Sequence, residues 1–144
     1  MEFTPRAERS FRLAQAEAHS LGHRAVGSQH LVLGLILLGD GVQFAVLQGL
    51  GCTADSVRRN IVAIGPLTED TQKIEGHQFG ASAARAVQRA GEEARAMTHT
   101  YVGTEHILLG LLSEESGPAA TLFLTQGMDT ARARNMILDE YRHV

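Results

Sequence analysis

Residues 102–112 of the chain read VGTEHILLGLL, and residues 26–36, which stand 76 positions earlier, read VGSQHLVLGLI. The two stretches share their valine, both glycines, their histidine and two leucines without a gap. Self-similarity at a fixed offset indicates an internal repeat. We therefore predict a duplicated chain, in which residues 1–64 form the first repeat, residues 65–78 a linker and residues 79–144 the second repeat.

Each repeat reads as four short helices. Thr4 suits an N-cap position with Pro5 as the first helical residue, and Ser28 is expected to cap a second helix that is apolar on nearly every side. A third helix over residues 42–50 and a fourth capped by Thr53 complete the first repeat. The second repeat is expected to hold helices over residues 81–97, 104–113, 118–126 and 130–141. Strand-like alternation is not evident, so the prediction is an all-α fold of two tandem four-helix repeats, packed as one pseudo-twofold eight-helix domain.

Composition and charge exclude several classes of protein. Thirteen basic and sixteen acidic residues leave a net charge of −3, which disfavours binding to nucleic acid because such proteins carry a basic face. A single cysteine, Cys52, excludes an internal disulfide and a multi-cysteine metal site. The only lysine, Lys73, is not part of a Gly-Lys-Ser/Thr phosphate-binding loop, so no ATPase site is expected.

The sequence gives no sign of membrane contact. Its longest apolar run, Leu31–Leu38, is far shorter than the roughly 20 residues that a membrane span requires. The N-terminal residues lack the apolar core of a signal peptide. We therefore expect a cytoplasmic protein.

Few side chains are spaced for catalysis or metal binding. The histidine pairs His23/His30 and His99/His106 recur in both repeats, and a structural role at the start of an apolar helix is favoured over metal binding. Cys52 is expected to be a buried packing residue, and the glutamate pairs at 92–93 and 114–115 are expected to be solvated. No catalytic residue, metal or cofactor is assigned, and the chain is not expected to be an enzyme.

The helix starts are the better candidates for a binding site. Free N–H groups and the positive end of the helix dipole attract anions, and such starts fall at Thr4 and at its equivalent Gly80. Glu105, in the first turn of its helix, either interacts with that helix or contacts a ligand, and its equivalent is Gln29.

Several of these segments resemble the Clp N-terminal repeat. They are Phe3-Thr4-Pro5-Arg6-Ala7, Leu21-Gly22-His23, Val26-Gly27-Ser28-Gln29-His30-Leu31 and Thr100–Leu112, with Gly51 and Gly127 completing the outline. The resemblance covers nearly the whole chain outside the linker, and it is strongest to the N domain of the ClpC-type AAA+ unfoldases. It implies an α-helical pseudo-dimer that docks substrates and adaptors.

The ATPase rings of those unfoldases have no counterpart here. The chain is expected to be a free-standing relative, with an excised domain as the alternative. The chain has twelve arginines and one lysine, a ratio that suggests an actinobacterial source.

The resemblance also implies a ligand, phosphoarginine, which marks proteins for degradation. In the family the glutamate of a Gly-Thr-Glu-His motif pairs with the guanidinium, while the Phe-Thr helix start receives the phosphate. Paired within each repeat, the first keeps Thr4 but has Gln29, and the second keeps Glu105 but has Gly80. On that pairing neither repeat is complete, and the second, which retains the carboxylate, is the better candidate.

Phe3 and Phe79 are either hydrophobic staples or the rims of an apolar groove. The resemblance implies the groove, because these positions bind macrocyclic antibiotics such as cyclomarin in mycobacterial relatives. The expected partners are therefore phosphoarginine-bearing or unfolded proteins, Clp adaptors or ClpC, and such macrocycles. The alternative is a small helical regulator that binds nucleic acid or another protein outside the Clp system.

Overall fold

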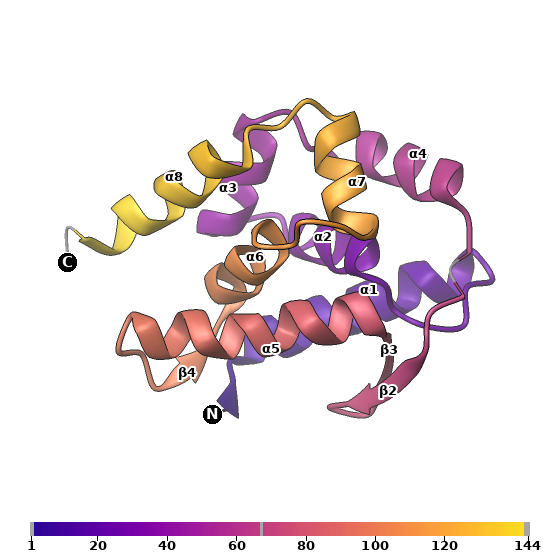
Figure 1. Ribbon diagram of the computed structural model, residues 1–144, viewed down its shortest axis with the longest axis horizontal. Coiled ribbons are helices and arrows are strands. Elements are labelled where there is room, and N and C mark those ends of the chain that lie inside the picture. Colours follow the sequence, from indigo (N-terminus) through magenta and orange to yellow (C-terminus); the bar gives the residue numbers. More distant parts are fainter. Residues whose placement is uncertain (1, 67, 143–144) are drawn as a thin grey trace.

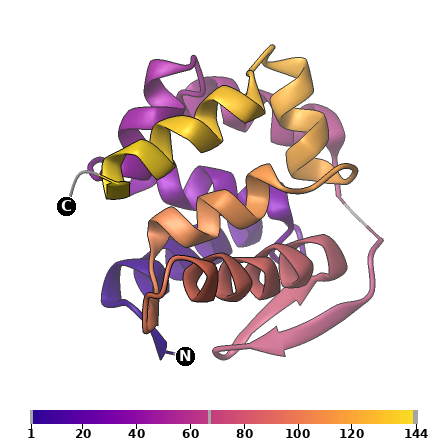
Figure 2. The same ribbon diagram turned by 60° about the vertical axis from the view of Figure 1, so that its left-hand side comes forward.

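The computed structural model describes residues 2–66 and 68–142, which form eight helices and four short strands (Figure 1, Figure 2). The first repeat holds α1 (Pro5–Ser20), α2 (Ser28–Leu37), α3 (Val42–Gly49) and α4 (Ala54–Ile64). The second holds α5 (Ala81–Ala96), α6 (Thr104–Leu112), α7 (Pro118–Thr125) and α8 (Thr130–Arg142). The all-α prediction is confirmed, and the helices begin and end close to their expected bounds.

The helices lie in three layers. In both views α2 and α6 form the middle layer, with α1 and α5 on one side and the remaining four helices on the other (Figure 1, Figure 2). The middle helices are apolar on nearly every side because neighbours cover them all round, and their residues from Leu31 to Ile36 and from His106 to Leu112 are buried.

Two equivalent glycines allow the outer and middle helices to approach closely. A Cβ atom at Gly34 would lie 2.4 Å from the backbone oxygen of Ser10 in α1, and one at Gly110 would lie 2.2 Å from that of Ala86 in α5. Any side chain at these positions would therefore separate the layers.

The repeats pack around an approximate twofold axis, as predicted. Across the repeats α3 packs on α8, and α4 packs on α7. The equivalent residues Cys52 and Met128 are both buried, and their sulfur atoms lie 3.6 Å apart, so the axis passes between them. Burial raises the pKa of the Cys52 thiol to about 11, in agreement with its expected packing role.

The expectation that the chain lacks strands is wrong. Strands β2 (Thr71–Ile74) and β3 (His77–Gly80) form an antiparallel hairpin within and just beyond the stretch expected to be a linker. Strand β1 (Glu2–Phe3) pairs in parallel with β4 (Tyr101–Val102), and the equivalent pair joins Phe79 to Val26. Strands this short carry too few residues for an alternating pattern to be recognised.

One glutamate of each of the two pairs is less solvated than expected, while Glu92 and Glu115 are exposed. Glu93 is only 5% exposed, and its carboxylate accepts hydrogen bonds of 2.8 and 3.0 Å from the two terminal nitrogens of Arg134 in α8. The carboxylate oxygens of Glu114 are also buried. Glu93 lies where α5 meets α8, and Glu114 lies near Ser28 of the other repeat. Sequence spacing on one helix does not reveal either contact.

Among the described residues, no single helix is long and apolar enough to cross a bilayer; α2 and α3 reach that length and composition only as a pair bent by 106°.

Candidate functional site

The short strands bring together helix starts from opposite repeats. The Thr4 amide donates to the carbonyl of Val102 at 3.0 Å, and the Gly80 amide donates to the carbonyl of Val26 at 2.8 Å. The N-terminus of α1 therefore adjoins the turn that leads into α6, and the N-terminus of α5 adjoins the turn that leads into α2. The pairing within each repeat, assumed from the sequence, is wrong because the strand partners are exchanged between the repeats.

We call the region of Thr4 and Glu105 the first site, and the region of Gly80 and Gln29 the second site. The four candidate residues thus divide into one site that keeps both the threonine and the glutamate and one that has lost both.

A third helix start joins each site. At the first site the Thr104 hydroxyl donates to the side-chain oxygen of Gln43 in α3 at 3.0 Å. At the second site the Ala119 amide of α7 donates to the Ser28 hydroxyl at 2.9 Å. Each site therefore gathers three helix N-termini, an arrangement whose partial positive charges suit an anion.

Helix α2 begins at Ser28, the residue that was expected to cap it, whereas α6 begins at Thr104 as expected. Gly27 and Gly103 occupy the N-cap positions, and Ser28 and Thr104 are the first helical residues. The expected capping role of Ser28 is therefore wrong, because its hydroxyl is bonded to α7 of the other repeat.

The histidine pairs fix these helix starts. His30 Nδ1 accepts the Gly27 amide at 2.8 Å, so a neutral His30 carries its proton on Nε2 and donates it to His23 Nδ1 at 3.0 Å. His106 and His99 repeat the arrangement, with distances of 2.9 Å to the Gly103 amide and 2.7 Å between the rings.

These contacts confirm the structural role predicted for the histidines. Burial, helped by His23, lowers the pKa of His30 to about 4, and burial also lowers the pKa of His106. Within residues 2–66 and 68–142, no group of three or more histidine, cysteine or acidic side chains could hold a metal ion.

Aromatic rings surround the carboxylate of the first site. The Glu105 side chain is 12% exposed, lies over Gly103 and accepts a hydrogen bond from the Tyr141 hydroxyl. Burial, together with this contact, raises the pKa of Tyr141. The His99 ring stacks on Tyr101 with centroids 5.1 Å apart and meets Tyr141 edge-on at 5.8 Å. A carboxylate beside aromatic faces is suited to a cation.

Thr4 supplies the other half of the first site. Its hydroxyl oxygen accepts the Ala7 amide at 3.1 Å, which caps α1 as predicted. A hydroxyl that accepts such a bond can still donate its own proton to a ligand. The first site therefore combines a donor and a positive helix end with a carboxylate, which are the groups that a ligand carrying both an anion and a cation requires.

The second site is built from the same backbone with different side chains. Gln29 is fully buried and lies over Gly27, as Glu105 lies over Gly103. Neither amide atom of Gln29 has a hydrogen-bond partner among the described residues.

The chain's own carboxylate occupies the start of α5 at this site. Glu69 accepts the Ser82 hydroxyl at 2.8 Å and the Ser82 amide at 3.3 Å. It takes space that Gly80 leaves open, since a Cβ atom there would lie 2.9 Å from Glu69 Oε1. The positive end of α5 thus already faces an anion.

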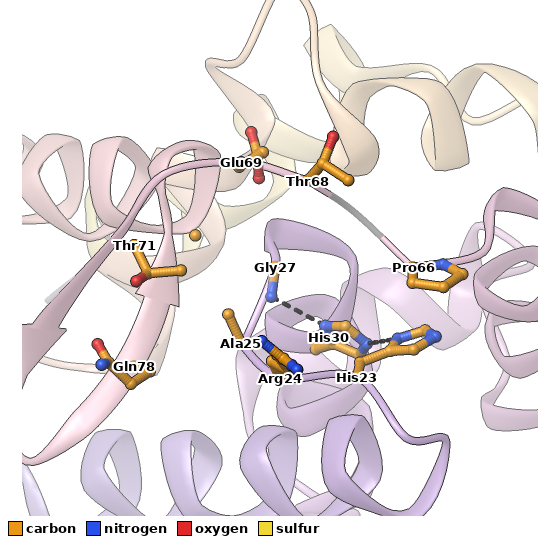
Figure 3. Close-up of a pocket in the computed structure, with 11 residues that line it drawn as sticks. His23, Arg24, Ala25, Gly27, His30, Pro66, Thr68, Glu69, Thr71 and Gln78 are labelled. Carbon is orange, nitrogen blue, oxygen red and sulfur yellow. Dashed lines mark hydrogen bonds between the residues drawn. The ribbon is translucent and has the colours of Figure 1, made fainter.

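A cavity of about 480 Å³ opens beside the second site (Figure 3). Its walls include the His23 and His30 rings and the backbone of Ala25 and Gly27, and Glu69 lies across from them.

Phe3 and Phe79 do not form a common exposed surface. Phe79 is fully buried under the stacked ring of His77, whereas Phe3 is half-buried, and both contact Phe11 edge-on at 5.3 and 5.2 Å. A groove of about 580 Å³ along α5 is lined by Phe3 together with Ile74 and Val87. Arginine and glutamine side chains also line this groove, so the surface accessible on the Phe3 side is only partly apolar. The staple interpretation fits Phe79.

Sequence reasoning missed Glu69, Tyr101 and Tyr141. The last two could have been found as departures from the repeat, since their equivalents are Ala25 and Gly65. Glu69 lies in the stretch expected to be a linker, where nothing in the sequence indicates its contact with Ser82.

Comparison with known proteins agrees with the fold. Residues 2–126 match the family model described as the Clp repeat (R) N-terminal domain. ClpC/MecB of Bacillus subtilis, described as a negative regulator of genetic competence, is 38% identical over 137 residues. ClpC of Staphylococcus aureus, described as an ATP-dependent Clp protease ATP-binding subunit, is 34% identical over 143 residues. Each alignment covers 94% of this chain and 16% of the relative.

Solved structures share the same architecture. The N-terminal domain of the chaperone ClpD from Arabidopsis thaliana superposes with a TM-score of 0.81 at 30% identity, covering 98% of this chain and 95% of that one. The Hsp104 N-terminal domain from Candida albicans shares the fold, with a TM-score of 0.74 at 18% identity over 96% of this chain and 90% of that one. The chain therefore belongs to the Clp repeat N-terminal domain family, as a homologue of the N-terminal regions of ClpC and ClpB.

Proposed function

We propose that the chain is a non-enzymatic recognition module of a Clp protein-quality-control system, and that its first site binds phosphoarginine on marked proteins. The observation that carries the proposal is the placement of Thr4 beside the turn into α6, which unites the retained threonine and glutamate in one site. Phosphoarginine requires a threonine for its phosphate and a glutamate for its guanidinium, and the first site has both, whereas neither repeat alone does.

The chemistry of the first site supports this ligand. A phosphate group at the start of α1 would receive backbone N–H groups and the Thr4 hydroxyl, while the guanidinium would pair with Glu105 and lie against aromatic rings. The second site has an amide in place of the carboxylate, and Glu69 already faces the start of α5. We therefore propose one phosphoarginine site for each chain.

The partners proposed for the module are phosphoarginine-bearing or unfolded proteins, Clp adaptors, and ClpC itself. A second candidate function is sequestration of a macrocycle such as cyclomarin. The groove at Phe3 supports it, because Phe3, Ile74 and Val87 supply apolar surface in its lining. A regulator of nucleic acid is less well supported, since the net charge of the chain is −3.

Calorimetric titration tests the phosphoarginine proposal. We expect phosphoarginine to bind with one site per chain, and arginine or phosphate alone to bind much more weakly. Glu105→Ala should weaken binding by roughly 10- to 100-fold, as expected for one hydrogen bond to a charged group. Glu92→Ala, at an exposed glutamate of α5, serves as the control and should bind normally.

Absence of binding by the folded protein, or equal binding by Glu105→Ala, would reject the proposal. Titration with cyclomarin, repeated with Phe3→Ala, would then test the groove.

A further inference from the structure

The two repeats differ at their histidine pairs, because aromatic rings pack on one pair and a cavity adjoins the other. In the second repeat Tyr101 stacks on His99 and lies 5.3 Å from His106, while Tyr141 packs edge-on against His99. At the equivalent positions the first repeat has Ala25 and Gly65.

The cavity beside the second site occupies the corresponding place. His23, His30, Ala25 and Gly27, which line it, are equivalent to His99, His106, Tyr101 and Gly103. The rings of the histidine pair point toward each other at the wall of this space (Figure 3). The cavity therefore lies where the second repeat packs its own tyrosines.

A buried amide lies behind Gly27, one of the residues that line the cavity. Gln29 is fully buried, and among the described residues neither its amide oxygen nor its amide nitrogen has a hydrogen-bond partner. Its equivalent, Glu105, receives the Tyr141 hydroxyl. A buried polar group without a partner lowers stability, and such groups often contact a ligand or an ordered water.

We propose that this cavity binds the side chain of a tyrosine supplied by another polypeptide. The ring packs against His23 and His30, as Tyr101 and Tyr141 pack against the equivalent pair, and the hydroxyl bonds with the Gln29 amide. An amide both donates and accepts, so it suits a neutral phenol. The second repeat supplies its own tyrosines to its histidine pair, and the first repeat lacks them. The proposal does not depend on phosphoarginine binding at the first site.

Titration with N-acetyl-tyrosinamide, followed by NMR of the histidine side chains, tests the proposal. We expect saturable shifts at His23 and His30, while His99 and His106 act as the internal control because tyrosines already cover them. N-acetyl-phenylalaninamide should bind roughly two- to tenfold more weakly, the loss expected for one hydrogen bond.

Two variants give the test its specificity. Ala25→Tyr restores the ring of the second repeat and should abolish binding, whereas Ala63→Tyr, at an exposed position of α4, should not. Gln29→Leu should remove the preference for tyrosine over phenylalanine while the protein stays folded. Glu105→Ala should leave the tyrosine titration unchanged, which separates this site from the first.

Three results would overturn the proposal. They are the absence of saturable shifts at His23, equal shifts at both histidine pairs, and unaltered binding by folded Ala25→Tyr. If Ala25→Tyr does not fold, the proposal is still tested by the shifts at the two histidine pairs and by the preference of Gln29→Leu for tyrosine or phenylalanine.

Discussion

Tyr141 donates a hydrogen bond to Glu105, the carboxylate that the proposed phosphoarginine site needs. The hydroxyl therefore competes with a guanidinium for one carboxylate oxygen. Tyr141→Phe keeps the ring but removes this competitor, so we expect it to raise the affinity for phosphoarginine by roughly two- to tenfold. Calorimetry checks this, with Tyr101→Phe as the control that keeps the stacked ring. Weaker binding by Tyr141→Phe would show that the hydroxyl helps to hold the ligand.

A second residue-scale prediction concerns Glu114. Burial raises its pKa from 4.5 to about 7, so its contribution to stability is present below pH 4.5 and is lost as the pH rises through 7. His30 acts in the opposite sense, because its pKa is lowered from 6.5 to about 4 and its contribution is lost as the pH falls through that range. The two effects oppose each other between pH 4.5 and pH 6.5, where both groups titrate.

Removing the Glu114 carboxylate should reveal the pH dependence of stability that His30 contributes. We expect Glu114→Gln to have a higher melting temperature than the wild type at pH 8, because a charged carboxylate is no longer buried. Its melting temperature should also fall more steeply from pH 7 to pH 5, where only the histidine contribution remains. Thermal unfolding followed by circular dichroism measures both. Parallel curves for the two proteins would contradict the assignment to Glu114.

At the scale of elements, Glu69 links the stretch before β2 to the start of α5. Its carboxylate accepts two hydrogen bonds from Ser82 and so does the work of the missing N-cap side chain at Gly80. We expect Glu69→Ala to lower the free energy of unfolding by about 0.5–2 kcal/mol, as for loss of an N-cap. Added phosphate should stabilise this variant more than the wild type, because it can occupy the vacated helix start.

Chemical denaturation with and without phosphate gives both results. Asp70→Ala removes a neighbouring exposed carboxylate and serves as the control for charge. An equal loss of stability in Asp70→Ala, or an equal effect of phosphate on all three proteins, would show that Glu69 does not cap α5.

The helices could be predicted from the sequence, and the strands could not. Apolar spacing, Thr4 and Thr53 as caps, and recurrent glycines define the helices locally, so their bounds follow from nearby residues. Strands β1 and β4 contain two residues each and exist because their partners lie in the other repeat. That partnership depends on tertiary packing, which local patterns do not contain.

In the whole molecule, the composition of the site also depends on tertiary packing that the sequence pattern does not contain. A gapless repeat shows that Thr4 is equivalent to Gly80 and Glu105 to Gln29, and both pairs were found from the sequence. Equivalence does not state which helix start lies beside which. Because the approximate twofold axis exchanges the strand partners, Thr4 lies with the second repeat's α6 rather than with its own repeat's α2.

Exchange of partners also predicts that neither repeat is stable alone. The core is continuous: α2 packs on α5, α6 and α7 of the other repeat, and the Cys52 and Met128 side chains meet at the axis. A separated repeat would expose the apolar face that these contacts cover, and a chain of 64 or 80 residues buries a smaller fraction of its surface than the whole domain of 144 residues. We therefore expect residues 1–64 and 65–144, prepared as separate peptides, to show little helix by circular dichroism.

Mixing the two peptides should restore helical content and, with it, phosphoarginine binding, since Thr4 and Glu105 come from different peptides. The matched control is the same mixture carrying Glu105→Ala, which should recover helix without recovering affinity. Stable helical structure in either peptide alone would mean that contacts within a repeat suffice for folding. The first site would still need both halves, because its threonine and its glutamate are brought together only by the pairing of β1 with β4.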